Sequence, residues 1–384
     1  MIMKYYYLLL FTAFILFSCG DSTETLTRKD NKKQQSLQNN NNEIPTDDRQ
    51  IIKKGSISQY TGKPGKLIIV AENTIYTKEL KVLFDSVFSA PIKPYYPYTP
   101  YFEIVHRTPT KFKQLSTRLR NVIEIDLNEK YKKNQPKMEI LEDYYAKTQL
   151  YTKLKAHDIN DVYELIQEEI NYLFKIYERQ EWKREYYRHA KNENNHVNQK
   201  LAKQFGINLK LPDNLRYESI SDEYAILLFP NRTRNMEMKT TNSSYTDTKV
   251  NFIQSGLMIW EYPFKDERQL KPENLMIMRD TILKYYAKHE IEGVYMGTQN
   301  HPAVKPIYHK IKIGDIEGWE FKGLFKFTGE AEPSGGRFWS FHFKHPHRNT
   351  IVALSGYIDA PPTFPANFDI NRIRAIIYSL SFTD

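Results

Sequence analysis

The sequence of 384 residues contains a single cysteine, Cys19. One cysteine cannot form a disulfide within the chain, and it cannot build the usual cysteine-rich zinc sites. The sequence also lacks the motifs G-x-S-x-G, G-x-x-x-x-G-K-[ST], H-E-x-x-H and G-x-G-x-x-G. These motifs mark hydrolase nucleophiles, phosphate-binding loops, zinc proteases and dinucleotide sites. We therefore predict no catalytic residue, no cofactor and no metal-binding residue, and the sequence favours a non-enzymatic protein without deciding the question.

A long apolar run is missing as well. The segment Tyr5–Phe17 is uncharged and apolar but has only 13 residues, whereas a membrane-spanning helix needs about 20. A run of this length after a basic residue, here Lys4, is typical of the core of a signal peptide. After Cys19 the chain turns at once to the polar segment 21–24, as expected where a leader ends. We predict a signal peptide over residues 1–18.

The sequence has 55 Lys and Arg residues and 46 Asp and Glu residues, which give a formal net charge of +9. The basic residues are spread along the chain and form no block. Five or more consecutive basic residues never occur, and no nucleic-acid-binding module accompanies the charge. We therefore predict no nucleic-acid partner. A solvated surface explains the excess most simply, and attraction to anionic lipid headgroups or polymers is the second interpretation.

Residues 19–65 are polar and poor in aliphatic side chains, and they include four consecutive asparagines, Asn39–Asn42. Such a segment cannot bury enough apolar surface to order itself. We predict a disordered tether here, with a root-mean-square reach of roughly 40 Å.

Residues 66–193 are predicted to form an N-terminal α+β domain. Strands are expected at 67–70, 102–105, 122–125 and 150–154, and helices at 77–88 and 111–119. A long helix should follow, because Asp158 and Asp161 can cap its start and apolar residues recur on one face from Val162 to Tyr177. Acidic residues come early in this helix and basic residues late, an order that complements the helix dipole.

Residues 194–384 are predicted to form a C-terminal domain, with the boundary near Asn192–Asn195. Strands are expected at 207–211, 224–229, 257–262, 309–313, 319–327, 338–343 and 351–358, and helices at 195–205, 276–287 and 369–380. Because the strands cluster and the helices stand apart, an antiparallel α+β sandwich is favoured over a doubly wound sheet. The predicted fold class is thus α+β, with two α/β-layer domains of mainly antiparallel sheets behind the signal peptide and tether.

A proline- and tyrosine-rich segment is the best candidate for partner binding. It contains Tyr95, Tyr96, Tyr98 and Tyr101 among prolines, a composition that favours an extended chain carrying aromatic rings. Such rings can stack on sugars or dock a protein partner. The alternative is a loop packed against its own domain.

Two further clusters have an ordinary and a chemical interpretation. His342, His345 and His347 could converge on a metal, or they could be solvent-facing residues at the end of a strand. Glu330 and Glu332 could perform acid–base chemistry, but their glycine-rich surroundings favour the tip of a β-hairpin. The sequence leaves metal binding by the histidines open.

Leu16-Phe17-Ser18-Cys19 resembles the lipobox of bacterial lipoproteins. The resemblance implies cleavage before Cys19 and lipid attachment to its sulfur, and two or three acyl chains would anchor the protein stably. Only Asp21 and Glu24 lie nearby as acidic residues, whereas the surface-export signal of such bacteria has a denser acidic cluster. We therefore expect lipid anchoring in the outer membrane, facing the periplasm.

The rest of the chain resembles an uncharacterised family of Bacteroidota lipoproteins, a domain of unknown function. The matching segments include GKPGKLIIV at 62–70, PYFEIVH at 100–106, FGI at 205–207 and GGRFWS at 335–340. The resemblance implies an envelope protein and supplies no catalytic residues. Residues 205–384 are also similar to the PsbP/Mog1 type of α-β-α sandwich, which would imply a binding or assembly role.

Taken together, these features predict a non-enzymatic binding or assembly module of the cell envelope. The expected partners are the membrane, through lipidated Cys19, and an envelope protein or glycan. The alternative is an enzyme acting on cell-wall or surface glycan. The oligomeric state is left open by the sequence.

Overall fold

The computed structural model describes residues 51–56, 58–115, 117–239, 246–288, 291–329, 335–361 and 364–382. Cys19, the predicted signal peptide and the predicted tether up to residue 50 lie outside these residues, as do Glu330 and Glu332. Within the described ranges, no helix is long and apolar enough to cross a membrane.

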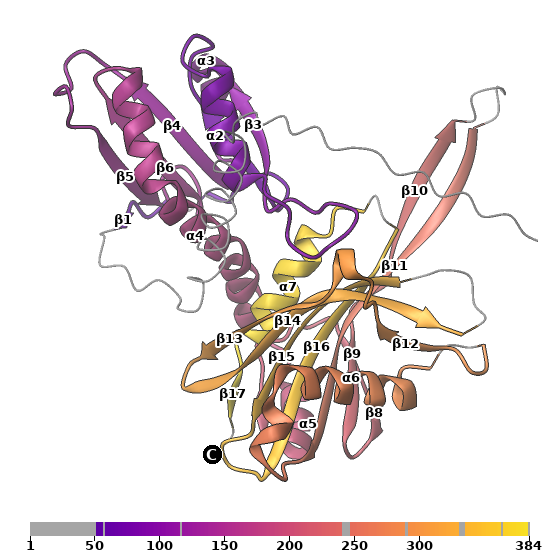
Figure 1. Ribbon diagram of the computed structural model, residues 1–384. Coiled ribbons are helices and arrows are strands. Elements are labelled where there is room, and N and C mark those ends of the chain that lie inside the picture. Colours follow the sequence, from indigo (N-terminus) through magenta and orange to yellow (C-terminus); the bar gives the residue numbers. More distant parts are fainter. Residues whose placement is uncertain are drawn as a thin grey trace, which may run out of the picture. The chain divides into compact units, whose positions relative to one another are not determined.

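The N-terminal half contains a six-stranded sheet in the order β1-β5-β6-β4-β2-β3 (Figure 1). Its strands are β1 (Ile52–Lys53), β2 (Lys66–Val70), β3 (Glu103–Arg107), β4 (Asn121–Leu127), β5 (Lys137–Glu142) and β6 (Leu150–Ala156). Its helices are α2 (Lys78–Phe88), α3 (Pro109–Leu115) and α4 (Ile159–Lys191). β1 pairs with β5 although it was expected to belong to the disordered tether. Its side chains are exposed, so backbone hydrogen bonds rather than apolar burial order this segment.

Pairing in this sheet is mostly parallel, and here the structure differs from the expected antiparallel arrangement. β2 runs parallel to β3 and β4, and β4 runs parallel to β6. The four residues Leu67–Val70 are all buried because helices cover both faces of the sheet. An unbroken apolar run of this kind is the mark of a parallel strand, and α2 and α3 supply the crossovers that parallel neighbours require.

Helix α4 begins as expected from its cap and its apolar face. The Asp158 side chain accepts hydrogen bonds from the amides of Asn160 and Asp161. Asp161 does not complete a capping box, because its own carboxylate is buried and accepts from the Asn134 amide at 3.1 Å. Val162, Ile166 and neighbouring residues of α4 pack on the sheet beside α2.

The C-terminal half is built on a nine-stranded sheet in which every pairing is antiparallel. Its strands are β8 (Arg216–Ser221), β9 (Tyr224–Leu228), β10 (Arg232–Lys239), β11 (Thr246–Pro263), β12 (Tyr295–Thr298), β13 (Ile307–Ile313), β14 (Ile316–Thr328), β15 (Gly335–Lys344) and β16 (Thr350–Asp359). The short strands β7 (Ile207–Asn208) and β17 (Ser381–Phe382) pair with each other. The helices are α5 (Asn195–Phe205), α6 (Pro272–Tyr286) and α7 (Asn367–Ile377), with 3-10 turns η1 (Glu267–Leu270) and η2 (Pro302–Val304). The prediction of an α+β protein with two domains is confirmed.

Side chains alternate between the two faces of the C-terminal sheet. Leu257 and Ile259 of β11 join one core with α5 and α7, whereas Met258 and Trp260 join another core with α6. Figure 1 shows α6 lying across the strands and the β10–β11 hairpin extending beyond them. This alternation gives three layers, with helices on both faces.

Side chains of both halves meet where α4 packs against α7. Glu178 of α4 forms a salt bridge with Arg374 of α7. The Trp182 ring lies 5.1 Å from that of Tyr378, edge to face. Burial alone would lower the pKa of Arg374, but the Glu178 carboxylate raises it above its ordinary value. The guanidinium therefore stays charged within this contact.

Candidate functional site

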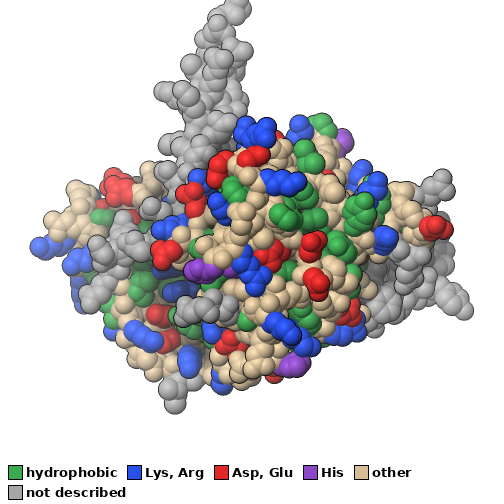
Figure 2. Space-filling view, turned by 90° about the horizontal axis from the view of Figure 1, so that it is seen from below, with side chains coloured by type: hydrophobic (Ala, Val, Ile, Leu, Met, Phe, Trp, Pro, Cys, Tyr) green, Lys and Arg blue, Asp and Glu red, His purple; other side chains and the backbone are tan. Residues whose placement is uncertain are grey.

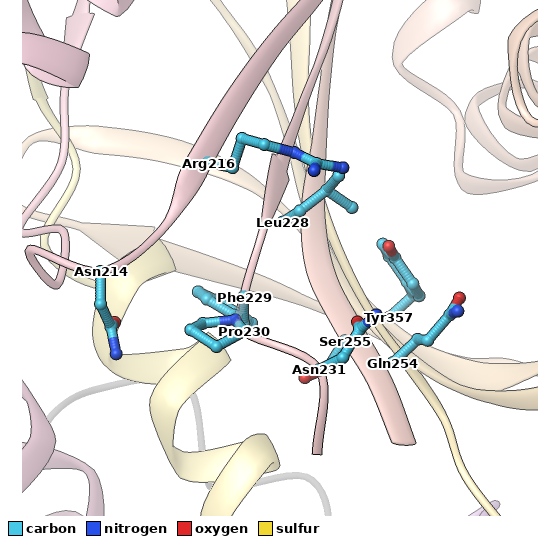
Figure 3. A pocket seen from close by; sticks show the side chains of 9 residues that line it. All are labelled: Asn214, Arg216, Leu228, Phe229, Pro230, Asn231, Gln254, Ser255 and Tyr357. Atoms are coloured by element: carbon cyan, nitrogen blue, oxygen red, sulfur yellow. The ribbon is translucent and has the colours of Figure 1, made fainter. Parts of the chain in front are cut away.

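An open pocket of about 320 Å³ lies where β9 ends and β10 begins (Figure 3). This volume is at the lower end of the range of ligand pockets, about 300–1,000 Å³. The lining residues come from four places in the chain: Asn214 and Arg216, Leu228–Asn231, Gln254 and Ser255, and Tyr357.

The pocket exists because the neighbour of β11 changes at this point. β11 pairs with β10 up to Ile253 and with β9 from Gly256 onward. Pro230 lies at the change and has no amide hydrogen to extend the ladder. A Cβ atom on Gly256 would lie 2.4 Å from the Leu227 carbonyl oxygen and 2.9 Å from Cε1 of Tyr357. Glycine is therefore required for the Tyr357 ring to lie over the strand beside the pocket.

The lining offers hydrogen bonds without acid–base chemistry. Asn214, Asn231 and Gln254 contribute amides, which donate and accept. Burial raises the pKa of Tyr357 to about 12, so its hydroxyl stays protonated and can donate. Among the described residues that line the pocket, none is an aspartate, a glutamate or a histidine. The amides and hydroxyls of the lining are suited to recognition of a polar ligand.

Two lining residues also contact a cluster of charges behind the pocket. The Ser255 hydroxyl accepts a hydrogen bond from Nη2 of Arg372 at 3.0 Å, and the Arg372 guanidinium lies 3.7 Å from the centre of the Phe229 ring. Asp369, which is fully buried, binds Arg372 at 3.0 Å and forms a second salt bridge with Arg232. Burial lowers the pKa of Arg372 to about 10, which still leaves it charged at neutral pH.

A second depression, of about 510 Å³, lies at the start of α4. It contains Asp158, Asp161 and Glu164 beside Lys133. The backbone hydrogen bond from the Asp161 amide lowers the pKa of Asp158, whereas a general acid needs a raised pKa. Asp158 caps α4 and Asp161 holds a loop amide, so both carboxylates have structural roles.

The predicted tyrosine segment is divided between the interior and the surface. Tyr95 is buried, and its hydroxyl donates to the Phe338 carbonyl of β15 at 3.0 Å. Tyr101 is half-buried, with its ring 5.0 Å from that of Phe174 on α4. Tyr96 and Tyr98 are exposed, at 66% and 78%. Tyr95 therefore serves the packing of this segment on the C-terminal sheet, and partner binding stays a prediction for the exposed pair.

The three histidines do not share one environment. His342 is buried under α6, against Trp260 and Phe321, and His345 is buried as well. Only His347 faces solvent, so the interpretation of all three as solvent-facing is wrong. The alternation of β15 places His342 on the face opposite Phe343 and carries it into the core. Within the described part of the chain, no group of three His, Cys, Asp or Glu side chains is placed to hold a metal.

Two family models match the chain. Residues 60–189 match the one described as Domain of unknown function (DUF8532), and residues 194–379 match Domain of unknown function (DUF4837). The expected resemblance to domains of unknown function is thereby confirmed, whereas its Bacteroidota lipoprotein part stays a prediction. The pocket and Arg372 fall within the DUF4837 region, and the depression at α4 falls within the DUF8532 region.

Two solved structures show a weak likeness to part of the chain. One is the Ran-binding protein Mog1p of Saccharomyces cerevisiae, with 9% identity, a TM-score of 0.29, and coverage of 47% of this chain and 91% of that chain. The other is a point mutant of protein Mog1, with 10% identity, a TM-score of 0.29, and coverage of 47% and 92%. The predicted likeness to the Mog1 type is confirmed as a weak structural resemblance. No curated protein matches the chain.

The sequence did not single out the residues of the pocket. Pro230-Asn231 after an apolar strand is a local turn signal, but Gln254 and Tyr357 join it only through strand pairing. Three strands of the same sheet, β8, β10 and β12, were not predicted at all. These strands are short or alternate only weakly between apolar and polar residues, so hydrophobic periodicity alone could not predict them.

Proposed function

We propose that the protein is a non-enzymatic binding or assembly module of the cell envelope, and that the DUF4837 region takes a polar ligand in the pocket of Figure 3. The observation that carries this proposal is the lining, which combines three amides, two hydroxyls, two aromatic rings and the guanidinium of Arg216 without a carboxylate or an imidazole. Amides and hydroxyls both donate and accept, as do the hydroxyls of a sugar, and a tyrosine ring can pack on the apolar face of a sugar. A hydroxyl-rich ligand the size of a monosaccharide fits this chemistry and volume.

Binding can be tested by titrating the full chain, in detergent, with glucose and N-acetylglucosamine and following ligand signals by saturation-transfer NMR. The variant Asn231→Ala with Gln254→Ala should lose saturation transfer, because it removes two of the three amides. Gln114→Ala, an exposed glutamine on α3, serves as the matched control and should bind like the wild type. Equal transfer in all three proteins would argue against the pocket.

For localisation we propose that Cys19 carries lipid and holds the protein at the outer membrane, facing the periplasm. Support comes from the lipobox-like sequence before Cys19 and from the absence of a denser acidic cluster after it. Cys19→Ala should move the protein from the membrane fraction to the soluble fraction. Retention of the variant in membranes would contradict lipid anchoring, and digestion by protease added to whole cells would contradict the periplasmic side.

The exposed rings of Tyr96 and Tyr98 are proposed as a second contact, for an envelope protein or glycan partner. Their exposure, at 66% and 78%, supports this proposal. Crosslinking in intact envelopes should recover a partner with the wild type and lose it with Tyr96→Ala combined with Tyr98→Ala. Figure 2 shows basic and acidic side chains interspersed on the face in view, so a partner that met this face would find no field of one sign.

A further inference from the structure

Three guanidinium groups surround the ring of Phe368 on α7. The guanidinium carbons of Arg188, Arg232 and Arg372 lie 5.1, 5.4 and 5.3 Å from its centre. They come from α4, from the first residue of β10 and from α7. We call Arg188, Arg232 and Arg372 the arginine cluster. Three like charges this close repel one another unless opposite charges compensate them.

Two carboxylates provide part of that compensation. Asp369 binds both Arg232 and Arg372, and Glu185 binds Arg188. Burial raises the pKa of Glu185, which weakens the compensation further, because the charged form of this acid is disfavoured. Even with both acids ionised, three positive charges face two negative ones. The cluster therefore carries an excess of at least one positive charge in a partly buried place, since the Arg372 side chain is 7% exposed but those of Arg232 and Arg188 are 35% and 51% exposed.

Unused hydrogen-bond donors accompany this excess. Nε of Arg232 and Nε of Arg372 are buried, and no acceptor among the described residues satisfies either of them. The Arg372 side chain is only 7% exposed, whereas Arg232 is 35% exposed and so is open to a ligand. An arginine fork has five N–H groups, and Asp369 engages only one nitrogen of Arg232. Counting only acceptors on the described residues, donors of Arg232 therefore remain for a second, negatively charged acceptor.

The arginine cluster borders the pocket. Ser255 and Phe229 line the pocket and both contact Arg372, and Asn231 lines the pocket and directly precedes Arg232. The charge of the arginine cluster is thus separated from the pocket by single side chains, whereas Arg216 lines the pocket itself. In a partly buried setting its field acts on a ligand more strongly than it would in water.

We propose that the ligand of this pocket carries a negatively charged oxygen group, so that an acidic or phosphorylated sugar is bound in preference to a neutral one. This inference rests on the proposed function and adds the charge of the ligand to it. The amides of the pocket bind the hydroxyls of the sugar, and Arg232 donates to its carboxylate or phosphate. A guanidinium paired with such a group forms the stronger, charge-assisted type of hydrogen bond.

The test uses the full chain in detergent at 50 mM salt, with glucose, glucuronate, glucose 6-phosphate and inorganic phosphate as probes. We expect at least one charged sugar to bind ten-fold or more tightly than glucose, and we expect 0.5 M salt to reduce that advantage, because salt screens the attraction. Arg232→Gln should bring the charged sugars to the level of glucose while glucose binding stays unchanged. Arg268→Gln is the matched control, because Arg268 is 81% exposed and does not line the pocket. It should change the binding of neither glucose nor the charged sugars.

The outcomes separate the two proposals. If glucose and the charged sugars bind equally to the wild type, the inference is wrong and the pocket stands. If inorganic phosphate binds as tightly as glucose 6-phosphate, the sugar adds nothing to the affinity. The inference that one ligand contacts both the pocket amides and Arg232 is then wrong. If no sugar binds, the proposed function falls and the inference falls with it. Should Arg232→Gln unfold, Arg232→Lys replaces it in the test, because lysine keeps the charge beside Asp369. Charged sugars should bind Arg232→Lys with an affinity between that of the wild type for charged sugars and that of the wild type for glucose. Wild-type affinity for charged sugars in Arg232→Lys would refute the role of the guanidinium fork.

Discussion

Acid should weaken the C-terminal half through one buried histidine. His342 lies beneath α6, its ring 5.6 Å from that of Trp260 and 5.0 Å from that of Phe321. Its Nε2 atom is 3.2 Å from the Ser340 hydroxyl. Burial, and secondly the charge of Arg279, lowers the pKa of His342 from 6.5 to about 3. Folding therefore requires this imidazole to be neutral.

The sign and size of the effect follow from that difference. In the unfolded chain His342 binds a proton below about pH 6.5, whereas in the folded chain it stays neutral down to about pH 3. The contribution of neutral His342 to the free energy of unfolding is complete above pH 6.5, and it is lost progressively as the pH falls from 6.5 toward 3. Since pH 5 lies about 1.5 pH units below the ordinary value, the free energy of unfolding drops by about 2 kcal/mol there. His189, with a pKa lowered to about 3 mainly by burial, adds a drop of similar size at α4.

Urea unfolding at pH 8, 7, 6 and 5 would measure this loss. Tryptophan emission is a suitable signal, because Trp260, Trp319 and Trp339 all belong to the C-terminal sheet. His342→Gln, which cannot take a charge at position 342, should lose about 2 kcal/mol less than the wild type between pH 8 and 5. His347→Gln, at an exposed position, is the control and should follow the wild type. An unchanged pH dependence in His342→Gln would refute the reasoning.

Substitutions at Glu181, Tyr95 and Gly256 test the packing, with Glu317 as a control position. Glu181→Gln leaves two buried arginines without their carboxylate, so it should lower the free energy of unfolding by about 3–5 kcal/mol. Glu317→Gln breaks an exposed pair and should lower the free energy of unfolding by less than about 1 kcal/mol in the same urea series. Tyr95→Phe removes one buried hydrogen bond and should cost about 1 kcal/mol, while Tyr95→Ala should cost about 3–5 kcal/mol; equal values would contradict the packing role. Gly256→Ala places a Cβ 2.4 Å from the Leu227 carbonyl oxygen. It should therefore lower the temperature of the unfolding midpoint and abolish saturation transfer to sugars in NMR. Sugar binding at the wild-type level would contradict the need for glycine at this position.

Elements with strong local signals could be predicted from the sequence. The cap at Asp158 and the apolar face from Val162 predicted α4, and the helix predicted at 195–205 is α5, which Gly206 ends with a left-handed φ of 68°. These features depend on residues close together in the chain, so their spacing carries the information. The antiparallel C-terminal sheet followed likewise from the order of its strands.

Other features depend on pairing between distant segments and could not be predicted. The apolar run Leu67–Val70 was assigned to a strand, but its consequence, a parallel sheet covered on both faces, was missed. Tyr95 was a candidate for the surface, and only contact with Phe338, 243 residues further on, shows that it is buried. The pocket likewise joins Asn214 with Tyr357 through strand pairing, which no local pattern contains.

The arginine cluster draws its members from both halves of the chain, and this couples ligand binding to their packing. Arg188 and Glu185 belong to α4, whereas Arg232 and Asp369 belong to the C-terminal half. An anion bound there would relieve repulsion between charges that the α4–α7 contact brings together. A ligand at one hundred times its dissociation constant would then add about 2.7 kcal/mol to the folded form. Only the part of this free energy that depends on α4 staying packed against α7 would hold the two halves together, because a ligand shifts an equilibrium by its difference in affinity for the two states.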